Sequence, residues 1–242
     1  MTIYGDLFQS FNEVQSNDQF VQQNKKMLKL NLAMGPIQAK VGSMVAYQGD
    51  VRFQNKGSGG LGKMLKKHVT GEGVEMMEVS GMGQVFLADS AQEVQIFYIE
   101  NDMVSVNGRN VLAFSSSIQW DVHRIKGAGM MAGGLFNVSL RGTGFVAITT
   151  DGDPMALNVA EAPTFADPQA AVLWTSGVQM STKTDFSGGL GSMLHGGTGE
   201  SIQLAFGGQG VVIIQPSEGT IWGNIGSDGG SGGGGVLGNL FD

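Results

Sequence analysis

MLKLNLAMGPIQAKVGSMVAYQGDV, residues 27–51, is the stretch that decides the fold, because two further segments of the chain repeat it without a gap. The second copy is VQIFYIENDMVSVNGRNVLAFSSSI (94–118), and the third is PMALNVAEAPTFADPQAAVLWTSGV (154–178). Few positions are identical, but many keep their chemical type. Four such sets are Leu30, Phe97 and Leu157; Leu32, Ile99 and Val159; Tyr47, Phe114 and Trp174; and Val51, Ile118 and Val178. A repeat of this kind indicates an architecture built from modules and names no reaction.

Each copy ends in a run of alternating apolar and polar residues. In the first copy, Val45, Tyr47, Val51 and Phe53 share one parity. Because side chains alternate across a β-strand, these runs predict strands that bury one face. We therefore expect the aromatic residue of each run to be buried, namely Tyr47, Phe114 and Trp174. The central position is small in all three copies (Gly49, Ser116 and Ser176), which indicates a bulge or a close backbone approach.

A second strand-like element follows each copy and contains two glycines two positions apart. The pairs are Gly81 and Gly83, Gly142 and Gly144, and Gly208 and Gly210. Glycine within a strand pattern marks a sharp bend of the sheet. A phosphate-binding loop is the alternative, but it would require a third glycine and a following helix. The sequence after Gly83 is strand-like, so we predict strands here.

The repeat predicts an all-β fold of three tandem β modules arranged as a pseudo-threefold barrel or prism. We expect one domain over residues 19–219, with modules at about 19–88, 89–148 and 149–215. Residues 1–18 form a polar leader. Residues 220–242 form a glycine-rich, flexible tail that ends in a small apolar tip.

Composition excludes several classes of protein. The chain has no cysteine, which rules out disulfides and thiolate chemistry. It has no transmembrane segment, because no apolar run approaches the roughly 18 residues of a membrane span. It also lacks a secretory or mitochondrial targeting pattern at its start, so we expect a soluble bacterial protein in the cytoplasm. The net charge of −7 opposes non-specific binding of nucleic acid.

In each of the three modules, one glycine-rich insert separates the two strand elements. Apolar residues lie among their glycines, whereas a loop tip is usually polar. We predict that they form an adaptable interaction surface for a partner, a lipid or a second copy; the alternative is that they plug the barrel ends. The surface consists of Leu61, Met64, Leu65, Met130, Met131, Leu135, Leu190, Met193 and Leu194. Basic residues gather in the first module, and the candidate anion-facing patch is Lys56, Lys63, Lys66 and Lys67. Solvated strand and loop faces are the alternative explanation of that charge.

No catalytic, cofactor or metal site is predicted. His68 and His195 occupy corresponding places in two inserts, but the middle insert has no histidine and further ligands are missing. Glu72 and Glu200 correspond in the same way, and we interpret them as anchors of loop backbone. Recognised nucleotide, hydrolase, zinc and calcium motifs are absent from the sequence.

The run MVAYQGDVRF (44–53), the GGLG-x-ML inserts followed by Thr-Gly-Glu, and the G-x-G-x-V strands resemble the altered-inheritance-of-mitochondria protein 24 family over about residues 19–219. The resemblance implies a fold similar to the tryptophan RNA-binding attenuation protein, a short variant of the double-stranded β-helix. It carries over no catalytic residue, and a fold-level likeness does not transfer RNA binding.

These observations together predict a non-enzymatic scaffold or interaction protein that uses the apolar inserts as its binding surface. A protein partner or self-association is expected, and peripheral membrane contact remains an open alternative. The alternative function is a small-ligand or RNA-binding module that uses the basic first repeat.

Overall fold

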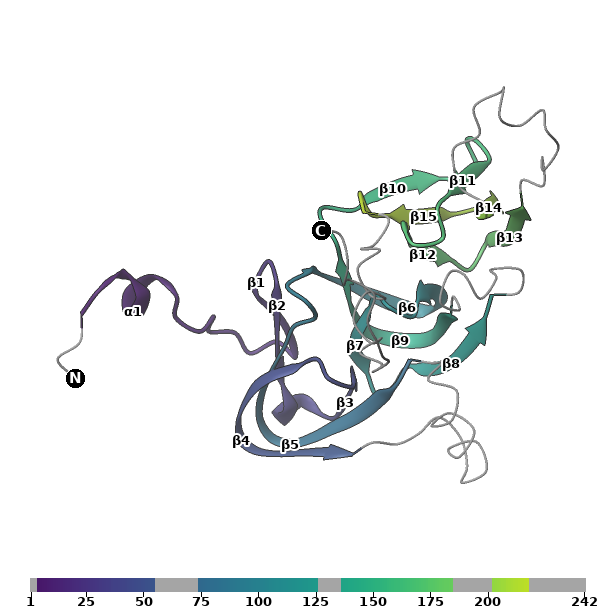
Figure 1. Ribbon diagram of the computed structural model, residues 1–242. Coiled ribbons are helices and arrows are strands. Elements are labelled where there is room, and N and C mark those ends of the chain that lie inside the picture. The colour runs from purple at the N-terminus through teal and green to yellow at the C-terminus, as the bar shows by residue number, and fades with distance from the viewer. Residues whose placement is uncertain (1–3, 55–73, 126–135, 185–201, 218–242) are drawn as a thin grey trace, which may run out of the picture.

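The computed structural model describes residues 4–54, 74–125, 136–184 and 202–217 (Figure 1). The regular secondary structure of these residues is almost entirely β. The strands are β1 (Phe20–Asn24), β2 (Met27–Asn31), β3 (Ile37–Lys40), β4 (Met44–Gln54), β5 (Met76–Leu87), β6 (Glu93–Asn107), β7 (Val111–Ser115), β8 (Gln119–Arg124), β9 (Phe136–Thr150), β10 (Met155–Asn158), β11 (Thr164–Ala166), β12 (Ala171–Thr175), β13 (Val178–Thr184), β14 (Ile202–Gly208) and β15 (Val211–Ile214). Two short helices accompany them, α1 (Asp6–Ser10) in the leader and the 3-10 turn η1 (Leu32–Met34) after β2.

Twelve strands form one antiparallel sheet, whose main path runs β1-β2-β5-β3-β7-β9-β6-β12-β15-β10. Strand β4 joins this sheet beside β5, and β8 joins it beside β9. The remaining strands form a three-stranded sheet in the order β11-β14-β13. The predicted all-β class is therefore confirmed. The described strands do not close into a barrel, and the pseudo-threefold prism stays a prediction.

The three copies of the repeat pair with their closing strands in the same register. Leu30 lies opposite Val85 in the first copy, and Tyr47 lies opposite Val85 on the other side of β5. The corresponding residues Phe97 and Phe114 both lie opposite Val146. In the third copy, Leu157 and Trp174 both lie opposite Val212. Each closing strand is thus flanked by the first and last strands of its own copy.

The first two glycine pairs lie within β5 and β9, as the strand interpretation predicts, whereas in the third pair Gly208 ends β14 and Gly210 lies in the bend before β15. Gly81 has a φ of 124°, and a Cβ there would lie 2.1 Å from the backbone oxygen of Asp50. A Cβ at Gly83 would lie 2.1 Å from the backbone oxygen of Gln48. The neighbouring strand β4 can approach β5 only because these positions carry no side chain. The alternative of a phosphate-binding loop is excluded at this pair, because β5 continues through both glycines.

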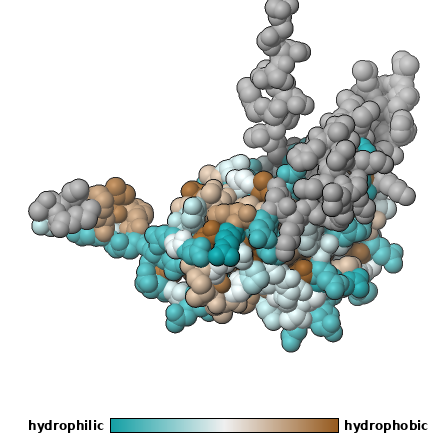
Figure 2. All heavy atoms as spheres, turned by 90° about the horizontal axis from the view of Figure 1, so that it is seen from below, coloured by the Kyte–Doolittle hydropathy of each residue, from teal (hydrophilic) through white to brown (hydrophobic). Residues whose placement is uncertain are grey.

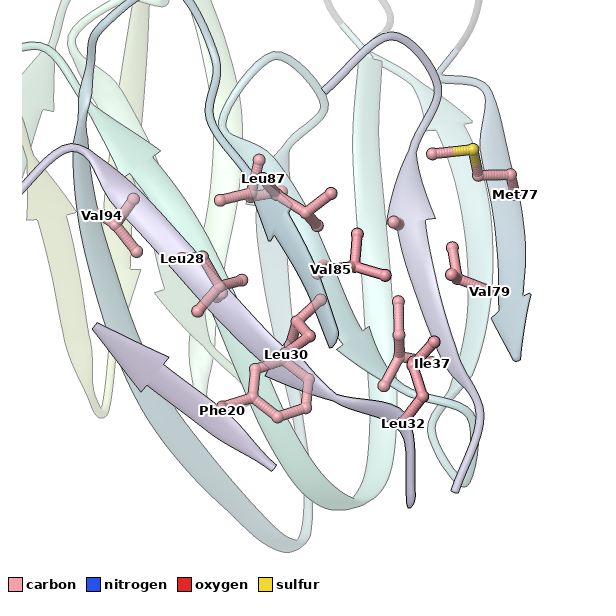
Figure 3. Packing of buried hydrophobic residues seen from close by; sticks show 14 residues of the cluster. Phe20, Leu28, Leu30, Leu32, Ile37, Met77, Val79, Val85, Leu87 and Val94 are labelled. Carbon is pink, nitrogen blue, oxygen red and sulfur yellow. The ribbon is translucent and has the colours of Figure 1, made fainter. Parts of the chain in front are cut away.

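Three hydrophobic clusters follow the three modules. Figure 3 shows the first, in which Leu28, Leu30, Val85 and Leu87 point into one space together with Val94 of the second module. The second cluster includes Met76 of the first module and Leu173 of the third. The third cluster contains Ile125 of the second module but no residue of the first. The core therefore connects module one to two and two to three.

One burial prediction is wrong. Phe114 is 0% exposed and Trp174 is 5% exposed, whereas Tyr47 is 50% exposed. The physical reason lies in the outer neighbour of each strand. Strand β7 also pairs with β3, and β12 also pairs with β6, but β4 pairs with β5 alone among the described strands. One face of β4 was expected to be buried. From Met44 to Asp50, however, the side chains on both faces of the strand are exposed.

Candidate binding cleft at the edge of β6

The residues predicted as an interaction surface lie outside the described residues. This holds for the nine apolar insert residues Leu61, Met64, Leu65, Met130, Met131, Leu135, Leu190, Met193 and Leu194. It also holds for the anion-facing patch Lys56, Lys63, Lys66 and Lys67, and for His68, His195, Glu72 and Glu200. The structure therefore leaves both predicted surfaces untested.

A cleft of about 430 Å³ lies between the second and third modules. Six consecutive residues of β6, from Gln95 to Glu100, line one side of it. Leu173 of β12 and Ile213 of β15 line the opposite side. Because neighbouring residues of a strand face opposite ways, a lining of six consecutive residues includes the backbone edge of β6. The cleft is mainly apolar, and its apolar side chains include Ile96, Phe97, Tyr98 and Ile99.

One edge of β6, the edge that faces away from β9, has no partner strand along this cleft among the described residues. At Val94 the N–H donates to the carbonyl of Lys25 (2.7 Å), and the carbonyl accepts a hydrogen bond from Gln22 Nε2 (2.8 Å). Backbone groups of alternate strand residues point to the same edge, so those of Ile96 and Tyr98 point the same way as those of Val94. Strand β9 pairs with β6 along the other edge, and within the described ranges no strand pairs with β6 at Ile96 and Tyr98 on the edge that faces away from β9. Their N–H and C=O groups can therefore accept an added strand.

The first module shows what such an edge accommodates. Strand β1 pairs along the equivalent edge of β2, with Phe20 opposite Leu30 and Val21 opposite Lys29. Counted from the start of each copy, Leu30 corresponds to Phe97 and Lys29 to Ile96. Phe20 is buried in the first cluster, where Figure 3 shows it beside Leu30. A short strand with apolar side chains thus fills in module one the position that is open in module two.

Hydrogen bonds hold the carboxylate of Asp102 at the cleft. The carboxylate of Asp102 accepts a hydrogen bond from the Met103 backbone N–H (2.7 Å) and another from the Ser176 hydroxyl (2.9 Å). These two bonds, the first being the larger cause, lower the pKa of Asp102 below its ordinary value. An ionised carboxylate with two donors already in place is a poor general base. It links β6 to the turn between β12 and β13 instead.

Metal-ligating groups do not gather in the part of the chain that the structure describes. There, no three or more histidine, aspartate or glutamate side chains are close enough together to hold an ion. None of the helices in the described ranges has the length and apolarity needed to cross a membrane.

Sequence reasoning missed this cleft. Apolar Phe20 and Val21 precede the first copy, and Leu87-Ala88 and Ala147-Ile148 stand at the matching distance before the other two. Leu87 belongs to β5, and Ala147 and Ile148 belong to β9, so among the described strands only the first copy has a separate covering strand before it. The sequence alone did not show that the uncovered edge of the second copy borders a hollow.

The fold and the cleft define an all-β repeat protein with an open strand edge at an apolar cleft. The comparisons with known proteins agree with this class. The family model described as Mitochondrial biogenesis AIM24 matches residues 19–217, and the chain belongs to this family. The resemblance found in the sequence is therefore confirmed.

Among solved structures, the chain is similar to the crystal structure of protein SPYM3_0169 from Streptococcus pyogenes. The two share 23% sequence identity, with a TM-score of 0.63 over 83% of this chain and 90% of that one. At this identity the likeness concerns the fold alone. No curated protein matches the sequence. The expected likeness to the tryptophan RNA-binding attenuation protein stays a prediction.

Proposed function

We propose that this protein is a non-enzymatic scaffold or interaction protein that binds an extended, apolar segment of a partner protein at the open edge of β6. The observation that carries the proposal is that β1 covers the equivalent edge of β2 in the first module. Addition of a strand to an exposed sheet edge is a common mode of peptide recognition. Membership of the AIM24 family agrees with a non-enzymatic role.

The chemistry of the cleft supports a peptide over a polar metabolite. Backbone groups of Ile96 and Tyr98 supply hydrogen bonds, while Phe97, Leu173 and Ile213 supply apolar contact. Burial of one large apolar side chain contributes about 1.5–3 kcal/mol. Two such side chains of the ligand would therefore offset much of the entropy lost by ordering a short segment.

The peptide DQFVQQNK, which reproduces residues 18–25, is a suitable probe because its central residues form β1 in this same chain. We expect it to bind the full chain and to shift the backbone amide resonances of Ile96 and Tyr98. A peptide with methylated alternate amides is the matched control, because it keeps the side chains but cannot pair as a strand. Equal binding of both peptides would show that the cleft takes an apolar ligand without strand addition, and would contradict the proposal.

The substitution Ile96→Pro tests the protein side. Its ring removes the N–H at the open edge, while the β9 ladder does not use that group. We expect Ile96→Pro to lose peptide binding and Ile96→Val to retain it. Both variants should be checked for an unchanged melting temperature. If Ile96→Pro folds and still binds as the wild type does, the edge of β6 is not the binding site.

A further inference from the structure

The modules meet at two junctions, and equivalent strand segments pair at both. The second strand segment of one copy, which is β3 in the first copy and the later part of β6 in the second, pairs with the last strand of the next copy. At the first junction, Ile37 lies opposite Ser115 and Ala39 opposite Ala113, from β3 and β7. At the second, β6 pairs with β12 in an equivalent register.

The second register places Val104 opposite Thr175 and Val106 opposite Leu173. These residues occupy the same positions within their copies as the residues of the first junction do. The two junctions are therefore two instances of one interface.

A third instance would join β11 to β4. The same positions there are Thr164 with Gln48, Phe165 with Tyr47, and Ala166 with Ala46. Strand β11 pairs with β14, and β4 pairs with β5. The other edge of each strand has no partner strand in the described ranges. The chain thus presents both halves of the repeated interface at its two ends.

Both free edges carry exposed apolar side chains. On β4 these are Met44, Val45 and Tyr47, and on β11 it is Phe165. At the two observed junctions the corresponding aromatic residues Phe114 and Trp174 are buried. Figure 2 shows a mixture of hydrophobic and polar residues on the face seen from below. A long, partly apolar strand with a free edge is a template for pairing with another chain.

We propose that β11 of a second copy of this chain pairs with β4 in the register of the two observed junctions. A second copy fits better than the chain's own β11, because β4 and β11 lie far apart in Figure 1 and the observed junctions hold them there. Two copies that each donate β11 to the other form the smallest closed assembly and leave neither edge free. This pairing is separate from the cleft of β6 and does not depend on the function proposed there.

The absence of cysteine makes disulfide cross-linking a direct test. Partner residues on adjacent antiparallel strands have Cα atoms about 4.5–5.5 Å apart, which suits a disulfide. The test variants are Ala46→Cys and Ala166→Cys, mixed as two separate full-length proteins and oxidised. The matched control is Ala39→Cys with Ala113→Cys in one chain, which reproduces the same positions at an observed junction. A second ladder uses Gln48→Cys with Thr164→Cys, and its control is Ile37→Cys with Ser115→Cys.

The expected result is a disulfide-linked dimer in the mixture, with little dimer from either single variant alone. Three results would overturn the proposal. One is an absence of cross-linking while a control pair cross-links. Another is a link that forms only within one chain when both test cysteines are combined. The third is equal dimer formation by one single variant, which would place the contact elsewhere.

Association without cysteines gives a second measurement. Sedimentation of the wild type should show self-association. In Tyr47→Lys the dissociation constant should rise about tenfold, because the substitution adds a charge and removes an aromatic contact at the centre of the junction. Met82→Lys adds the same charge at an exposed residue of β5, a strand that β4 already flanks, and should associate as the wild type does. Equal association of all three proteins would show that β4 is not part of the interface.

Discussion

Strands β4 and β7 occupy the same place in two copies of one repeat, yet their environments are opposite. All five residues of β7 are buried, whereas the first seven residues of β4 are exposed. Both strands pair with the closing strand of their own module. Among the described strands, only β7 of these two has a second neighbour, the strand β3 of the preceding module. Burial in this repeat is therefore set by the adjacent module rather than by the residue types of the strand.

The largest expected effect concerns the aromatic residue at the centre of each strand. Phe114→Ala should lower the free energy of unfolding by about 3–5 kcal/mol, because it leaves a cavity in a packed cluster. Tyr47→Ala should cost less than about 1 kcal/mol, because Tyr47 is half exposed and contacts Phe53 edge-on. Chemical denaturation of both variants measures the difference.

Both variants should be measured at low protein concentration, so that self-association does not cover β4. If Tyr47→Ala were as destabilising as Phe114→Ala under these conditions, β4 would be covered within the single chain. That result would favour closure of the three modules on themselves.

The same comparison of β4 with β7 shows how much of the fold could be predicted from the sequence. The strands could be expected, because alternation and the glycine pairs are local signals, whereas their order in the sheet could not. The exposure of Tyr47 could not, because Tyr47, Phe114 and Trp174 have the same local pattern and differ only in a neighbour from another module. The cleft was hidden for a similar reason: its walls, Phe97, Leu173 and Ile213, come from three separate strands.

The next effect concerns the close approach of β4 and β5. Gly81→Ala should lower the free energy of unfolding by about 2–4 kcal/mol, because its Cβ would overlap the Asp50 carbonyl at a φ that favours glycine. The matched control is Gly207→Ala in β14, where a Cβ would meet no atom within 4 Å. It should be nearly neutral. Similar losses in both variants would mean that β4 does not lie against β5 as described.

A smaller effect is expected where the leader is fastened to the first module. The Lys29 side chain is 1% exposed, and its ammonium forms an ion pair with Glu13 and donates to the Val14 carbonyl (2.8 Å). Glu13→Ala removes the counter-charge and should cost about 1–3 kcal/mol, the usual penalty for a buried polar group that loses a partner. The corresponding residue of the second copy is Ile96, which borders the open cleft instead.

Limited proteolysis provides the second readout for Glu13→Ala. Cleavage within residues 4–19 should be faster than in the wild type, because the leader loses its anchor beside β1. Glu161→Ala, at an exposed carboxylate that accepts a hydrogen bond from nearby Asn158, is the control and should be cleaved as the wild type is. Identical cleavage of Glu13→Ala and wild type would show that the ion pair does not hold the leader.

The smallest effect concerns the point where the three copies begin. The Lys25 ammonium lies 3.2 Å from the Glu93 carboxylate and 3.1 Å from that of Asp153. Glu93 and Asp153 directly precede the second and third copies. The hydrogen bond from Lys25 is the main cause that lowers the pKa of Asp153 below its ordinary value of 3.8. Because the folded pKa is the lower one, this stabilisation is complete above the unfolded pKa and is lost as the pH falls through the folded value.

Asp153→Asn should therefore lower the melting temperature at pH 7 by no more than about a degree, since exposed ion pairs contribute little. The difference from the wild type should shrink as the pH falls below about 4 and vanish below the folded pKa, where Asp153 is protonated in both states. High salt should reduce it as well, because exposed charges are screened. A difference that persists unchanged at pH 2 would mean that Asp153 acts through its shape or backbone contacts and not through the charge it places beside Lys25. The link between the three starts would then have to come from packing alone.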